Sequence, residues 1–78
     1  MPVEEKIERV FGEIGIDKSE LRPEAELKAG LGIDSTEMVE LLVALEKEFS
    51  VKIPDGAING GSTVREIIKY FSNAAARS

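Results

Sequence analysis

The sequence contains neither cysteine nor histidine, and these two absences exclude several kinds of chemistry. Without cysteine, the chain can form no disulfide and no thiolate metal site. Without histidine, it lacks the commonest general base and the commonest metal ligand of proteins. We therefore expect no metal site and no self-contained Ser-His or zinc chemistry.

The chain also lacks a long apolar run and a surplus of basic residues. No stretch approaches the roughly 20 apolar residues of a membrane span, and the N-terminus has no apolar signal-peptide core. The formal net charge is −5, so the surface would repel the phosphates of nucleic acid and of anionic membranes. These features predict a cytoplasmic protein that binds neither, and whose partners present basic faces.

With 78 residues, the chain has room for one small domain, and we expect a single monomeric domain over 1–78. Its acidic charge is concentrated in the middle, because residues 31–55 carry six acidic and two basic side chains. A basic partner is therefore expected to approach this middle stretch.

Apolar residues recur every three or four positions in three segments, which is the spacing of an amphipathic helix. Gly15 is a plausible left-handed stop for the first segment. Asp34 with Glu37, and Thr63 with Glu66, have the capping-box spacing at the starts of the other two. The predicted helices are at about 3–14, 35–50 and 63–73.

Two segments between the helices lack a helical period. Residues 16–30 indicate a long loop with a helical turn near 18–21, pinned to the core by leucines. The glycine-rich residues 56–61 favour a loop or one irregular turn, because each glycine costs about 1 kcal/mol relative to alanine inside a helix. Three amphipathic helices must bury their apolar faces together, so the sequence predicts an all-α fold with one shared core.

Val39 and Val43 lie one turn apart on the flank of the second helix, beside its buried stripe. They either widen the face that packs on the core or form an exposed apolar strip bordered by Glu40 and Glu46. An exposed strip of this kind would mark an interaction surface. The sequence leaves both alternatives open.

A serine hydroxyl stands at the start of the second helix, in the segment Leu31-Gly32-Ile33-Asp34-Ser35. Backbone N–H groups and the helix dipole favour a bound phosphate at such a position. Together with the acidic helix behind it and the Ile-Pro-Asp turn at 53–55, this segment resembles the attachment site of acyl carrier proteins. The similarity extends over nearly the whole chain.

The resemblance implies a small antiparallel four-helix bundle, with a short third helix near 56–61 besides the three predicted helices. It also implies that a phosphopantetheinyl transferase moves 4′-phosphopantetheine from coenzyme A onto Ser35. Asp34 would cap the helix and help to bind the transferase and its metal. The thiol of the arm would then carry acyl groups as thioesters between acyl-transferring or synthase enzymes, in fatty acid, lipid or specialised-metabolite biosynthesis. The chain itself would be a non-catalytic carrier.

By the same resemblance, the acidic second helix docks on basic faces of partner enzymes, and the core can admit the acyl chain. The expected docking residues are Thr36, Glu37, Val39, Glu40, Val43, Glu46, Glu48 and Asp55. The expected walls of an acyl pocket are Leu27, Leu41, Leu45, Ile53, Ile58, Ile67, Ile68 and Phe71. In the unloaded protein these apolar side chains would form a closed core.

Three features depart from the family pattern. Thr36 stands where the family usually has leucine, Lys47 interrupts the acidic run, and the glycine-rich segment 56–61 replaces the usual third helix. These departures indicate a specialised carrier rather than the housekeeping one. Two other functions remain open, namely a carrier of aminoacyl or peptidyl groups and an interaction module that keeps the fold but is never modified.

Overall fold

The computed structural model describes residues 2–76, with side chains as far as residue 73. This part of the chain contains three α-helices, α1 (Val3–Glu13), α2 (Ser35–Phe49) and α3 (Val64–Ala76), and one 3-10 helix, η1 (Lys18–Glu20). The helix starts agree with the prediction to within one residue. Residues 74–76 continue α3 beyond its predicted end near 73, and residues 77–78 lie outside the described part.

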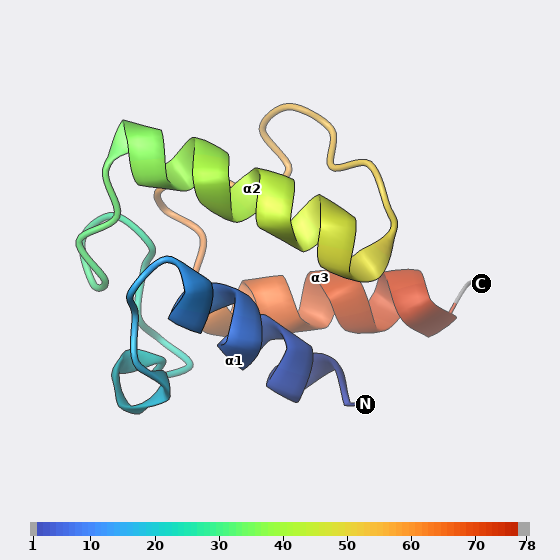
Figure 1. Cartoon of the computed structure of the whole chain (residues 1–78), viewed down its shortest axis with the longest axis horizontal. Coiled ribbons are helices and arrows are strands. Elements are labelled where there is room, and N and C mark those ends of the chain that lie inside the picture. Colours follow the sequence, from blue (N-terminus) through green and yellow to red (C-terminus); the bar gives the residue numbers. More distant parts are fainter. Residues whose placement is uncertain (1, 77–78) are drawn as a thin grey trace.

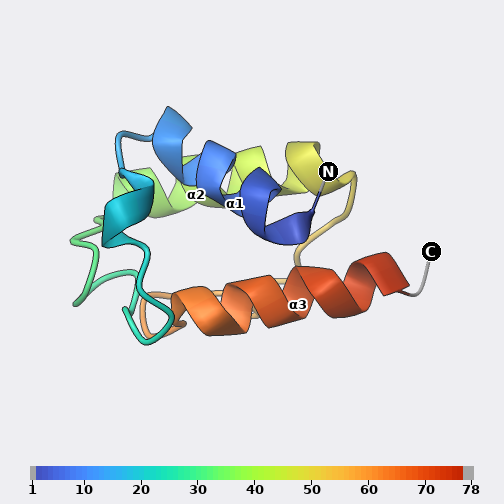
Figure 2. The ribbon, with the colours of Figure 1, turned by 90° about the horizontal axis from the view of Figure 1, so that it is seen from below.

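The three α-helices do not all alternate in direction. In Figures 1 and 2, α1 points opposite to α2, whereas α3 points the same way as α2. The helix α1 packs against both of the others. The helix α1 is therefore antiparallel to both of the helices that it packs against, in agreement with the predicted antiparallel bundle. The long connection 50–63 returns the chain to the starting end of α2 before α3 begins, so α2 and α3 run in the same direction.

The short helix that the resemblance implied near 56–61 is not formed, and the irregular turns that its glycines predicted are found instead, so the described residues make a bundle of three α-helices rather than four. This segment is a series of turns and bends around Asn59. Its side-chain oxygen accepts a hydrogen bond from the Gly61 N–H at 2.8 Å, and its own N–H donates to Ser62 Oγ at 3.0 Å. Gly56 has a φ of +84°, which is outside the helical region.

Left-handed residues end the first two helices. Gly15, the predicted stop of the first helix, has a φ of +89°. Ser50 has a φ of +53° and donates its N–H to the Glu46 carbonyl at the end of α2. The helical turn expected near 18–21 is η1, which Asp17 caps. The Ser19 hydroxyl and N–H both donate to the Asp17 carboxylate, and these hydrogen bonds lower the pKa of Asp17.

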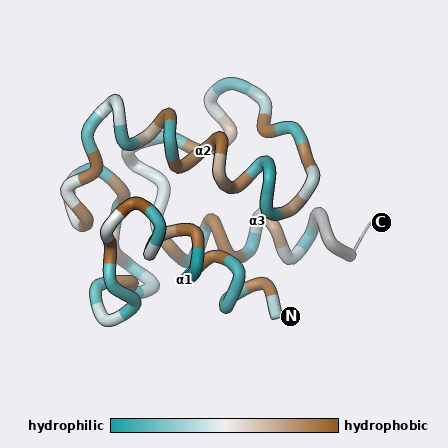
Figure 3. Tube along the Cα trace, viewed as in Figure 1, coloured by the Kyte–Doolittle hydropathy of each residue, from teal (hydrophilic) through white to brown (hydrophobic). Residues whose placement is uncertain are grey.

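Each helix contributes one apolar face to a single core, so apolar and polar stretches alternate along each helix in Figure 3. The Phe49 ring at the end of α2 stacks on Phe71 of α3, with ring centroids 4.3 Å apart. Ile58 is also buried and anchors the turns of segment 56–61 to this core. The largest fully buried side chains are Ile7, Val10, Phe11, Leu27, Leu41, Leu45, Ile67 and Phe71.

The two long connections are tied to each other by backbone hydrogen bonds. The Leu27 and Lys28 N–H groups donate to the Ser62 and Gly60 carbonyls of the second connection, and the Val64 and Arg65 N–H groups at the start of α3 donate to the Ala25 and Pro23 carbonyls, all at 2.9–3.0 Å. Leu27 is fully buried, and Leu21 and Leu31 pack half-buried against the core, as predicted for the pins of this loop. The loop before α2 is therefore held in place from both sides.

Two glycines predict opposite effects of the same substitution. A Cβ at Gly30 would lie 2.8 Å from the backbone N and O of Glu26, so Gly30→Ala is expected to lower the free energy of unfolding by about 1–3 kcal/mol. A Cβ at Gly12, within α1, meets nothing within 4 Å, so Gly12→Ala should raise it by about 0.5–1 kcal/mol. Urea unfolding followed by circular dichroism measures both. Equal effects of the two substitutions would contradict this packing of the loop.

Candidate functional site

The loop before α2 fixes where the second helix starts. Gly32 has a φ of +71°, a conformation that glycine adopts without strain. Ile33 is 2% exposed and donates its N–H to the Leu27 carbonyl at 3.0 Å. One residue supplies the turn and the next anchors the loop in the core, so the backbone at Asp34 and Ser35 is held at the surface on a fixed support.

A reciprocal capping box closes the start of α2. The Asp34 carboxylate accepts the Glu37 N–H at 2.8 Å, and the Glu37 carboxylate accepts the Asp34 N–H at 3.2 Å. This is the capping predicted from the sequence, with aspartate in the cap role. The Asp34 and Glu37 carboxylates form this cap, and the Ser35 hydroxyl takes no part in it.

The hydroxyls of Ser35 and Thr36 are both exposed and form no hydrogen bond with any residue of the described part. The backbone N–H groups of these two residues also lack an acceptor there, as expected in the first turn of a helix. A phosphate esterified to Ser35 would lie beside these donors and at the positive end of the α2 dipole. The site therefore fits a covalently attached phosphate group.

Comparison with protein-family models gives a match over residues 5–71 to the phosphopantetheine attachment site family. Since the match covers most of the chain, the protein belongs to this family. Domains of the family carry a covalently attached 4′-phosphopantetheine, which is thus the prosthetic group of this protein. The exposed and unbonded Ser35 hydroxyl suits such an attachment chemically.

The structure decides between the two readings of the valine pair. Val39 is 62% exposed and Val43 is 45% exposed, and they are the large hydrophobic side chains that the described part leaves at the surface. The pair therefore forms the exposed apolar strip and does not extend the core.

The other expected docking residues differ in how free they are. Glu37 is engaged in the capping box, and the Glu46 carboxylate accepts the Ile53 N–H at 2.7 Å and so holds the chain after α2. Both of these carboxylates support the fold. Thr36, Glu40 and Asp55 are exposed, while Glu48 is half-buried.

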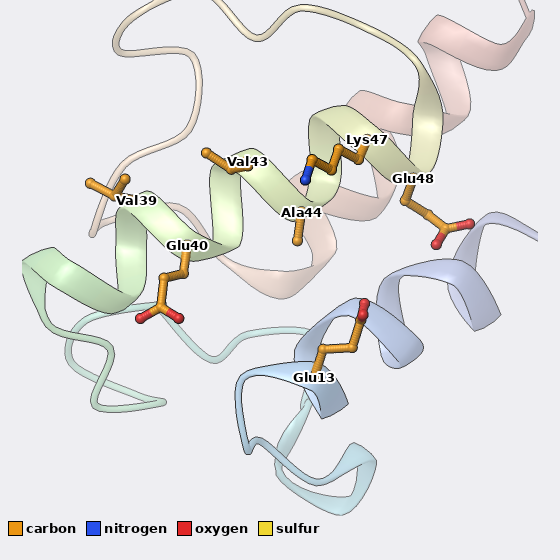
Figure 4. Close-up of a pocket in the computed structure, with 7 residues that line it drawn as sticks. All are labelled: Glu13, Val39, Glu40, Val43, Ala44, Lys47 and Glu48. Atoms are coloured by element: carbon orange, nitrogen blue, oxygen red, sulfur yellow. The ribbon is translucent and has the colours of Figure 1, made fainter.

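A groove runs between the C-terminal end of α1 and the outer face of α2 (Figure 4). It brings together four of the expected docking residues, Val39, Glu40, Val43 and Glu48. It also includes Glu13, Ala44 and Lys47, which we did not predict as docking residues. The signal that the sequence offered for Glu13 was its place as an acidic residue near the end of the first predicted helix. The way that α1 crosses α2 places it there, and no sequence spacing reveals that crossing.

The residues expected to wall an acyl pocket converge on the core. Leu27, Leu41, Leu45, Ile58, Ile67 and Phe71 are buried, and Ile53 and Ile68 pack half-buried against them. Ile58 and Ile67 also line a second hollow, between the 57–62 segment and α3. An opening there would lead to the core.

Proposed function

We propose that the protein is an acyl carrier that holds acyl intermediates as thioesters on a phosphopantetheine arm attached to Ser35. The observation that carries this proposal is the exposed Ser35 hydroxyl, which forms no hydrogen bond while Asp34 and Glu37 cap the helix. A serine kept for capping would be bonded to the helix end. Free of that role, Ser35 is available as a nucleophile for a modifying enzyme.

Attachment of the arm joins Ser35 Oγ to the phosphorus that bears the pantetheine in coenzyme A. The bond from that phosphorus to the rest of the pyrophosphate breaks, and adenosine 3′,5′-bisphosphate leaves. The hydroxyl proton passes to a base of the transferase, since no side chain of the described part is bonded to Ser35. When bound, the arm supplies a terminal thiol that forms the thioester with the acyl group.

The acidic face of α2 supports a role as a shuttle between partner enzymes. Attraction between exposed carboxylates and a basic partner surface raises the association rate more than the affinity. A carrier recognised in this way can leave each enzyme after transfer. We propose a monomeric, cytoplasmic carrier for a fatty acid, lipid or specialised-metabolite pathway, with Thr36 and Lys47 favouring a specialised one.

Intact-mass spectrometry tests the carrier function. The purified protein is incubated with coenzyme A, Mg²⁺ and a broad-specificity phosphopantetheinyl transferase, and we expect a mass gain of one phosphopantetheine group. Mass analysis of the protein from its native host then identifies the acyl or aminoacyl cargo. Absence of a gain with several transferases would favour the unmodified interaction module instead.

Two substitutions at Asp34 separate its capping role from its charge. Asp34→Asn keeps an oxygen acceptor for the Glu37 N–H, so stability should change little. Asp34→Ala removes the acceptor and should lower the free energy of unfolding by about 1 kcal/mol. If the carboxylate also guides the transferase, both variants should be modified more slowly than the wild type in a timed mass assay. An Asp34→Asn variant modified at the wild-type rate would leave capping as the role of Asp34.

A further inference from the structure

The groove between α1 and α2 combines an apolar floor with unpaired charges. Val39, Val43 and Ala44, which come from two successive turns of α2, supply the apolar part. Figure 4 shows Glu13 rising from α1 toward the side of α2 that carries Glu40 and Ala44. The groove is therefore formed by two helices, α1 and α2, and not by one face of α2 alone.

The charged side chains of the groove are free. Glu13, Glu40, Glu48 and Lys47 form no ion pair or hydrogen bond with any residue of the described part. Three carboxylates and one ammonium group of the groove therefore have no counter-charge within the described part. Lys47 follows Val43 by one helical turn, so a positive charge lies next to the valine strip inside an otherwise acidic rim.

We infer that this groove binds a partner protein through a segment of mixed charge. The segment inserts an apolar side chain over Val39 and Val43, places basic groups against Glu13, Glu40 and Glu48, and places an acidic group against Lys47. The acidic group is the specific part, because a uniformly basic partner would be repelled at Lys47. This inference rests on the proposed carrier function, since it names the partner chemistry that such a carrier would select.

Charge complementarity favours a partner protein over a second copy of this chain. Two copies joined through the valine strip would bring six groove carboxylates together against two lysines. Repulsion of this kind opposes self-association. A partner with basic groups and one acidic group satisfies every charge in the groove.

Three synthetic helical peptides of equal length test the inference by titration into ¹⁵N-labelled protein. All three have arginines on both sides of a central position, which is leucine in the first two. The first also carries a glutamate one turn from the leucine, the second has arginine at that place, and the third has serine instead of the leucine. We expect the first peptide to shift the amide signals of the groove and to bind about three- to ten-fold more tightly than the second. The third should bind more weakly than the first.

Charge reversal on the protein supplies the matched comparison. Lys47→Glu should invert the preference between the first two peptides, whereas Lys52→Glu, an equal change at an exposed position outside the groove, should leave their ratio unchanged. Glu13→Gln should weaken binding of the first two peptides by about two-fold. An unchanged preference in Lys47→Glu would overturn the inference. So would signals that shift only outside the groove, or sedimentation showing that the chain dimerises through Val43.

The peptide experiment is independent of the carrier function. It uses the protein with an unmodified Ser35, so a failure leaves any phosphopantetheine mass gain untouched. A missing mass gain would equally leave the peptide preferences as they were measured.

Discussion

Alanine in place of Ser35 is expected to abolish attachment of phosphopantetheine completely while leaving the fold intact. The Ser35 hydroxyl is the proposed nucleophile, and no other atom of that side chain could form the phosphodiester. Its hydroxyl makes no hydrogen bond with the described residues, and alanine is a good helix former, so the free energy of unfolding should change by less than about 0.5 kcal/mol. Intact mass and urea unfolding measure the two effects on one sample.

Thr36→Ala is the matched control for this substitution. Thr36 carries a second exposed and unbonded hydroxyl in the next position of the same helix turn. Its removal should leave the full mass gain in place. Loss of the gain in Thr36→Ala with retention in Ser35→Ala would move the attachment point to Thr36.

Phe71→Ala is expected to lower the free energy of unfolding by about 3–5 kcal/mol. Phe71 is fully buried, stacks on Phe49 at 4.3 Å and meets the Tyr70 ring edge-on at 5.1 Å. Truncation would remove both ring contacts and leave a cavity where α2 meets α3. For a domain of this length, whose total stability is about 4–12 kcal/mol, this loss is between about a quarter of the stability and all of it.

Two further substitutions test whether the loss of stability in Phe71→Ala comes from the buried volume of the Phe71 side chain. Phe71→Leu keeps most of the buried apolar volume and should cost much less than alanine. Val39→Ala removes an apolar side chain that is already 62% exposed and should change stability by less than about 0.5 kcal/mol. Urea unfolding followed by circular dichroism compares all three variants. Similar losses in Phe71→Ala and Val39→Ala would contradict the assignment of core and surface.

The helices and their caps could be predicted because their signals are local. Apolar spacing located the three α-helices, and the Asp34–Glu37 and Thr63–Glu66 pairs form reciprocal capping boxes in the structure. The direction of α3 could not be read in this way. It depends on how the connection 50–63 crosses the bundle, and the resemblance to a four-helix family suggested a helix at 56–61 that the glycines of this chain do not form.

The candidate site likewise contains residues that local sequence predicts and residues whose role depends on how the helices pack. The Ser35 position followed from the segment 31–35 together with the acidic helix behind it and the Ile-Pro-Asp turn at 53–55, because all of these signals can be read along the chain. The exposure of Val39 and Val43 stayed undecided, since a flank position on a helix is buried or open according to its neighbours. Glu13 was missed as a groove residue because only the packing of α1 against α2 brings it beside Ala44 and Lys47.

Site-resolved mass spectrometry of the modified protein gives the decisive result for the carrier function. After reaction with coenzyme A and a phosphopantetheinyl transferase, the protein is digested and its fragments are sequenced. We predict one phosphopantetheine group, carried by Ser35 and by no other residue. An unmodified protein after treatment with several transferases, or a group found on a different serine or threonine, would contradict the assignment of Ser35 as the attachment site.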